Sequence, residues 1–224
     1  MSDDEHGRST GTGRLITAVA WTVLLLGLWL WGRDVTGVPA NPSGPASGDV
    51  AGLGRDAGTG YLPAPAKPLE RSVPQRVDIP ELGVQAPVVA RGLDSRGAID
   101  PPPFDQAGVV GWYGAGATPG AAGTALLVGH VDTRTRPAVF YKLSTLTPGE
   151  TVRVVRADAK VAEFTVDDVE VLPNDHFDAR RAYGTRVAGR AELRLITCGG
   201  VFDPVSGGYT ANVVVSAYLT GTAP

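Results

Sequence analysis

Cys198 is the only cysteine in the sequence and the residue with the most distinctive chemistry. It lies in the stretch LRLITCGGVFD, where alternating strand-forming residues lead to a pair of glycines. A thiol becomes a nucleophile when a base or a positive charge holds it as thiolate. Two interpretations are therefore open, a buried packing residue and a catalytic nucleophile, and spacing alone favours the first.

Three histidines are candidate partners for this thiol. His6 lies in a charged N-terminal tail, and His176 lies in the acidic stretch LPNDHFDARR, which we interpret as a solvated loop. A weak cation site that joins His176 to Asp167 and Asp168 is a minor alternative, and we predict neither a metal nor a cofactor. His130 follows the apolar run TALLVG and could be a structural residue, but it lies where a strand meets a loop, a common position for functional groups.

The elements that would position Cys198 and His130 are β-strands. After about residue 71, short β-branched runs alternate with turn sequences such as TPGE and SGGY, and none has sustained helical periodicity. The runs are RVDIPELGVQAPVV, TALLVGHV, ETVRVVRA, AEFTVDDVEVL, ELRLITC and NVVVSAYL. This pattern predicts a mainly-β domain, a closed barrel or a sandwich, with one or two short helices near AVFYKLSTL.

The N-terminal part has a different character. The run LITAVAWTVLLLGLWLW is uncharged and flanked by arginines, and a helix slightly longer than it spans a hydrocarbon core of about 30 Å. We predict a single transmembrane helix over residues 15–33, preceded by a cytoplasmic tail over residues 1–14, because basic residues before the run favour an inside N-terminus. A cleavable signal peptide ending near Val38–Ala40 is the alternative.

The remaining chain divides into a linker and one folded domain. Residues 34–70 are rich in Gly, Pro and Ala and have too few large apolar residues to offset the entropy of ordering, so we predict a flexible tether. Residues 71–224 are long enough for one buried core. On the transmembrane interpretation, this domain lies outside the cell and is held to the membrane as a single-pass protein.

Composition excludes two classes of protein. The net charge is −3, the pI is near 5.6, and the sequence has no dense run of basic residues. These features exclude the positively charged surface that binding of nucleic acid requires. A single cysteine cannot form an internal disulfide, so the chain is not a disulfide scaffold.

The order of the motifs resembles the sortases, the membrane-anchored cysteine transpeptidases of Gram-positive cell surfaces. TALLVGHVDT is followed by β structure, then by ELRLITCGGVFD and NVVVSAYL, and RVDIPELGVQAPVV resembles the opening strands of that domain. The CGGVFD and YTANVVV details are most similar to class F. The resemblance covers residues 76–219, and it implies an eight-stranded β-barrel whose nucleophile is Cys198 and whose catalytic histidine is His130.

The resemblance also implies a reaction and its partners. Sortases cleave a sorting motif of the Leu-Pro-X-Thr-Gly kind between Thr and Gly in secreted proteins, then pass the acyl group to an amine of a cell-wall precursor. Cys198 would form the thioacyl intermediate. His130 would protonate the departing amine and then deprotonate the incoming one.

One family feature is missing. Sortases usually have an arginine at the start of the last strand, but no Arg or Lys follows Cys198 here. Asn212 is the predicted substitute, because its amide can donate a hydrogen bond where negative charge develops, although it could instead stabilise a turn. Arg134 or Arg136, in the loop after His130, could also fill this role, whereas Arg194 lies four residues from Cys198 and is out of easy reach.

Two other classes remain open. A different cysteine acyltransferase, such as an L,D-transpeptidase, would share the Cys/His pair, but the SHGC type of motif is absent. A non-catalytic or weakly active wall-binding or assembly module that retains the barrel is the second alternative, and the missing arginine motivates it.

Overall fold

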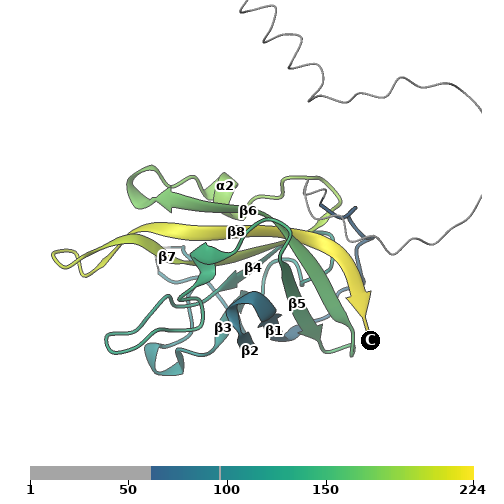
Figure 1. The fold of residues 1–224 in the computed structure, drawn as a ribbon, viewed down its shortest axis with the longest axis horizontal. Coiled ribbons are helices and arrows are strands. Elements are labelled where there is room, and N and C mark those ends of the chain that lie inside the picture. The colour runs from purple at the N-terminus through teal and green to yellow at the C-terminus, as the bar shows by residue number, and fades with distance from the viewer. Residues whose placement is uncertain (1–61, 96) are drawn as a thin grey trace, which may run out of the picture. The chain divides into compact units, whose positions relative to one another are not determined.

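The computed structural model describes residues 62–95 and 97–224, in which eight strands form a closed barrel (Figure 1). Around the barrel the order is β1-β2-β3-β4-β7-β8-β6-β5, and β5 closes on β1. The strands are β1 (Pro74–Ile79), β2 (Val84–Arg91), β3 (Val110–Tyr113), β4 (Gly123–Val128), β5 (Thr151–Arg156), β6 (Val161–Pro173), β7 (Ala191–Asp203) and β8 (Gly208–Ala223). The prediction of a mainly-β closed barrel is confirmed.

Short helices occupy the connections. They are η1 (Pro80–Leu82), η2 (Phe104–Gln106), η3 (Leu143–Thr145), η4 (Asn174–His176) and α2 (Ala179–Tyr183). Every predicted run contains a strand, and η1 divides the first run into β1 and β2. The sequence pattern missed β3, because four residues, VGWY, are too few to show an alternation.

The interior of the barrel is filled by alternate residues of its strands. Leu193 and Leu195 of β7 are fully buried there, opposite Ala217 and Val215 of β8. Strand side chains alternate between the two faces of a sheet, so the residues between them point outward. The connection after β4 contributes Phe140, which is also fully buried in this core.

A second apolar cluster lies on the outer face of the barrel and is covered by α2. Val214 belongs to it, although the adjacent Val215 belongs to the interior core, which places the cluster on the opposite face of β8. The buried members are Val128, Leu172, Ala182, Ile196 and Val214, with Ile99, Phe177 and Tyr183 packed against them. In Figure 1, α2 lies beside β6, next to the long β7–β8 pair.

The chain before β1 is hydrogen-bonded to the barrel. The Ala66 amide donates to the Leu219 carbonyl over 2.8 Å, and the Tyr218 hydroxyl donates to the Pro63 carbonyl over 2.6 Å. The fully buried guanidinium of Arg156 donates to the Glu70 carbonyl, also over 2.6 Å. Residues 62–73 are therefore held along the barrel surface.

The predicted N-terminal tail and transmembrane helix lie outside the described residues. Between residues 62 and 224, Arg96 excepted, no helix has the length and the apolar character that crossing a membrane requires. The transmembrane helix stays a prediction from the sequence.

Candidate active site

A parallel strand pair brings His130 and Cys198 to the same end of the barrel. The ladder between β4 and β7 ends at Val128 opposite Ile196, and the Gly129 amide still donates to the Ile196 carbonyl over 3.1 Å. His130 and Cys198 each lie two residues beyond this last pair. Ile196 belongs to the outer cluster, and alternation along β7 therefore directs Cys198 to that same face. His130 lies just beyond the end of β4, at the same end of the barrel.

Cys198 is presented on the outer face of β7. The residue is exposed, and it pairs directly with Asn212 of β8. Although the residue is exposed at the surface, the protein packed around its sulfur partly desolvates the thiol and so raises the pKa of Cys198. The negative charge of Asp132 raises this pKa further. Because both effects favour the neutral thiol, Cys198 needs an adjacent cation to react as thiolate, and a protonated His130 would supply it.

His130 is half-buried and its ring is held from two sides. Its Nε2 donates to the carbonyl of the buried Pro102 over 2.7 Å, and the ring stacks on Phe104 with centroids 4.3 Å apart. Since a carbonyl only accepts, Nε2 carries a proton, and Nδ1 is the ring nitrogen that this hydrogen bond does not use. The loop between β2 and β3 therefore sets the orientation of the imidazole.

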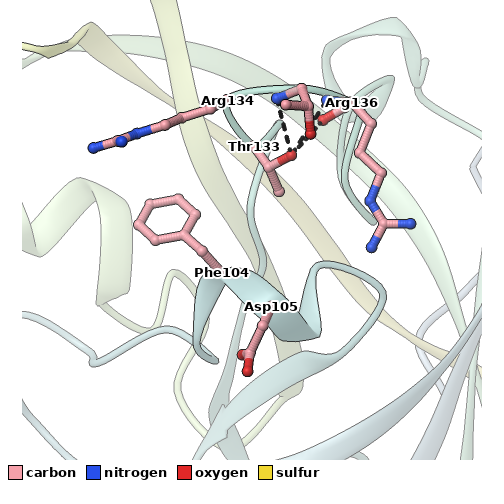
Figure 2. Close-up of a pocket in the computed structure, with 6 residues that line it drawn as sticks. Phe104, Asp105, Thr133, Arg134 and Arg136 are labelled. Carbon is pink, nitrogen blue, oxygen red and sulfur yellow. Dashed lines mark hydrogen bonds between the residues drawn. The ribbon is translucent and has the colours of Figure 1, made fainter.

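Phe104 also lines a hollow of about 480 Å³ beside the loop that follows His130 (Figure 2). Thr133 and Arg136 form a turn in which the Thr133 amide donates to the Arg136 carbonyl over 2.8 Å. Figure 2 shows Arg134 extending on the side of Phe104 and Arg136 extending to the opposite side. Asp105 and Thr135 complete the lining.

Asn212, the predicted oxyanion donor, shares a face with Cys198 and is already engaged in one contact. Its Nδ2 donates to Oδ1 of Asn174 over 2.8 Å, and Asn174 in turn donates to the Tyr209 carbonyl over 2.7 Å. A side-chain amide has two hydrogens, so one remains for a further acceptor. Arg194 is fully buried and bonds to Glu192 over 2.9 Å, which keeps it away from Cys198.

Four site residues were not identified from the sequence: Pro102, Phe104, Asp132 and Tyr209. Asp132 carried a usable signal, because it lies two residues after His130 in GHVD and therefore on the same side of an extended chain. The Tyr209 hydroxyl donates to the Asp132 carboxylate, a contact across 77 positions that no local pattern predicts.

The acidic residues around His176 contact arginines. Asp168 accepts from Arg186 over 2.9 Å, and Asp167 lies 3.4 Å from Arg190. His176 is exposed, 3.7 Å from Asp175. Within residues 62–95 and 97–224 no group of His, Cys, Asp and Glu side chains is arranged to hold a metal ion.

An exposed cysteine and a histidine at the same end of a closed β-barrel define a candidate cysteine-dependent enzyme. The sequence matches the Sortase domain over residues 77–220, and the chain therefore belongs to the sortase family, whose members are typically cysteine transpeptidases.

Solved structures of sortases share the fold. The chain is similar to sortase C-1 of Streptococcus pneumoniae, with 21% identity and a TM-score of 0.50 over 66% of each chain, just under two thirds. It is also similar to sortase C1 of Streptococcus agalactiae, with 19% identity and a TM-score of 0.50, over 66% of this chain and 67% of that one. These structures are class C sortases, and at such identities the likeness is one of fold alone. A comparison with curated proteins gives no match.

Proposed function

We propose that this protein is a membrane-anchored cysteine transpeptidase that cleaves a sorting motif of the Leu-Pro-X-Thr-Gly kind between Thr and Gly. The observation that carries this proposal is the β4–β7 register, which ends two residues before both His130 and Cys198 and so brings both to one end of the barrel. A nucleophile and its base must lie within reach of one substrate bond, and the neighbouring ends of β4 and β7 favour such an arrangement.

The proposed reaction has two steps. The Cys198 thiolate attacks the threonine carbonyl carbon, and the C–N bond to glycine breaks as the His130 imidazolium passes its Nδ1 proton to the departing amine. An amine of the cell-wall precursor then attacks the thioester and loses a proton to His130, and the Cys198 thiolate leaves. The cycle needs no cofactor.

The outer apolar cluster supports an apolar sorting motif. Ile196 lies two residues before Cys198 on the same face of β7, and Val214 lies opposite it on β8. Phe177, which lies just before α2, and Tyr183, at the end of α2, are only partly buried. Ile196 and Val214 are already buried, so a leucine and a proline of the motif would cover the exposed parts of Phe177 and Tyr183 and so contribute binding free energy.

We further propose that the protein is a class F sortase of the cell surface, whose partners are secreted proteins that carry sorting signals. The support is in the sequence, in CGGVFD around Cys198 and in YTANVVV at the start of β8. The structures reported above are of class C enzymes, and they bear on the fold and not on the class.

A cleavage assay tests the proposed function. The purified full-length chain is incubated with a library of sorting-motif peptides and an amine acceptor, and mass spectrometry identifies the products. We expect cleavage between Thr and Gly with transfer to the amine. No cleavage of any peptide would contradict the proposal.

A non-catalytic assembly module is the second candidate, and the absence of Arg and Lys after Cys198 favours it. Because the chain has one cysteine, a thiol-reactive probe reports on Cys198 alone. An enzyme should be labelled at neutral pH and protected by its peptide substrate. Slow labelling without protection by any peptide would support the module.

The role of Asn212 leads to a kinetic prediction. If its free amide hydrogen binds the oxyanion, Asn212→Ala should lower kcat by about 10²-fold, the scale seen when one such donor is removed, with a smaller change in KM. If Arg134 provides the charge instead, Arg134→Ala should cause the large loss and Asn212→Ala should be nearly silent. Thermal melts of both variants separate lost chemistry from lost folding, and unchanged kinetics in Asn212→Ala at unchanged stability would remove it from the site.

The predicted anchor leads to a topological prediction. Protease added to intact cells with a permeable wall should release the barrel by cutting within residues 36–61, because exposed segments of small and polar residues are preferred cleavage sites. Immunoblotting of the medium measures the release. Complete protection would contradict an extracellular domain, and loss of residues 1–40 from the purified protein would favour a signal peptide.

A further inference from the structure

The segment that carries His130 leaves the barrel directly after β4. The last backbone bond of this segment to β7 is the one from Gly129 to Ile196. Beyond it the chain folds into its own hairpin, in which the Phe140 amide donates to the His130 carbonyl and the Ala138 amide donates to the Val131 carbonyl, both over 3.0 Å. Among the described residues, no backbone hydrogen bond joins this hairpin to β7 or β8.

A side-chain contact makes that connection instead. The Tyr209 hydroxyl, at the start of β8, donates to Oδ2 of Asp132, two residues after His130. Both side chains are half-buried. The contact therefore joins the hairpin of His130 to the β7–β8 pair that carries Cys198.

Tyr209 is itself held in place. It pairs with Phe202 of β7, and the two rings meet edge to face with centroids 5.4 Å apart. Its carbonyl accepts from Asn174, which also bonds to Asn212, opposite Cys198. Phe202 holds the ring of Tyr209 and Asn174 holds its backbone, so its hydroxyl is a fixed donor. The position of Asp132 therefore follows that of the β7–β8 pair.

Charge couples this contact to the nucleophile. The pKa of the Cys198 thiol is raised mainly by partial burial of the sulfur and then by the negative charge of the Asp132 carboxylate. The hydrogen bond to Asp132 raises the pKa of Tyr209 to about 12, with smaller contributions from burial, Asp132 charge, Cys198 and Tyr141. The charge of Asp132 therefore acts on both the Tyr209 hydroxyl and the Cys198 thiol.

We propose that Asp132 and Tyr209 are positioning residues, whose hydrogen bond holds His130 at the distance from Cys198 that proton transfer requires. This inference rests on the proposed transpeptidase function. Neither residue touches the reacting atoms, and the hydrogen bond between them acts on the reaction through His130. Proton transfer depends on sub-ångström placement, so a mobile His130 hairpin would slow the reaction more than it weakens peptide binding.

Kinetics of the full-length chain test the proposal. Tyr209→Phe and Asp132→Ala should each lower kcat about tenfold, the value of one hydrogen bond to a charged group, with KM changed less than about twofold. The double variant should be no worse than the more damaged single one, because both lose the same contact. Tyr218→Phe is the matched control, since it removes a tyrosine hydroxyl bond at the far end of β8 and should leave kcat unchanged.

Two measurements that do not depend on turnover test this inference independently of the proposed function. Hydrogen exchange of residues 130–140 should be faster in Tyr209→Phe and unchanged in Tyr218→Phe. The pH midpoint for alkylation of Cys198 should move lower in Asp132→Asn, which loses the charge, and should not move lower in Tyr209→Phe, which keeps it.

The outcomes are distinct. Unchanged exchange of residues 130–140 in Tyr209→Phe would overturn the proposal, as would normal kcat in that variant or losses that multiply in the double variant. A wild-type chain without turnover would contradict the transpeptidase function, while the exchange and alkylation results would still test the contact.

Discussion

Cys198→Ala is expected to abolish cleavage and transfer of a sorting peptide while the barrel stays folded. The nucleophile forms the only covalent bond to substrate in the proposed cycle, so its loss should lower turnover by roughly 10³-fold or more. Cys198 is exposed and lies outside both apolar clusters, so its removal leaves no cavity in the core. Peptide cleavage followed by mass spectrometry, with a thermal melt, measures both parts of the prediction.

His130→Ala should cause a loss of similar size, because the same cycle needs its imidazole twice. The double variant with Cys198→Ala should be hardly worse than either single variant, as in other sites that act as a unit. His176→Ala is the matched control, since the His176 side chain is 86% exposed and should not affect turnover. Cleavage near the wild-type rate by either catalytic-site variant would refute the assignment.

The largest expected effect on stability is at Glu192, far from the proposed chemistry. Glu192 and Arg194 are both fully buried and bond to each other over 2.9 Å. The same carboxylate accepts from the backbone amides of Arg186 and Val187 and from the Arg190 side chain. It therefore ties the connection between β6 and β7 to the barrel.

Glu192→Ala should lower the free energy of unfolding by about 3–5 kcal/mol, because it leaves the Arg194 charge buried without its partner. Urea unfolding of the full-length chain, followed by tryptophan fluorescence, measures the loss. Glu163→Ala is the control, since Glu163 pairs with Arg153 at the surface and such pairs contribute about 1 kcal/mol or less. Equal losses in the two variants would contradict the argument.

Glu192 also predicts an acid limit of stability. Burial alone would raise its pKa, but hydrogen bonds from Arg186, Val187 and Arg194 hold the pKa of the folded state below the ordinary value. Its contribution is therefore present above the unfolded pKa of about 4.3 and is lost as the pH falls through the lower folded value. Glu192→Gln should weaken this acid dependence, which unfolding curves between pH 6 and about pH 3 would measure.

The local sequence was sufficient for most strands and for the central pair of the candidate site. Alternating runs such as ELRLITC predicted β7, because one face of the strand packs in the interior and the pattern survives in a few residues. The alternation did not predict β3, because that strand is too short to show a pattern. Cys198 and His130 were identified by their chemistry and by their positions at strand ends, and their roles stay predictions.

The sequence by itself determined which side chains could react and where most of the strands lie, since both are properties of short stretches of chain. Only the tertiary structure decided that Val128 pairs with Ile196, that Pro102 and Phe104 hold His130, and that Tyr209 reaches Asp132. These contacts join residues 26 to 77 positions apart. They depend on strand register and on closure of the barrel, which arise from burial summed over the whole domain and not from any local pattern.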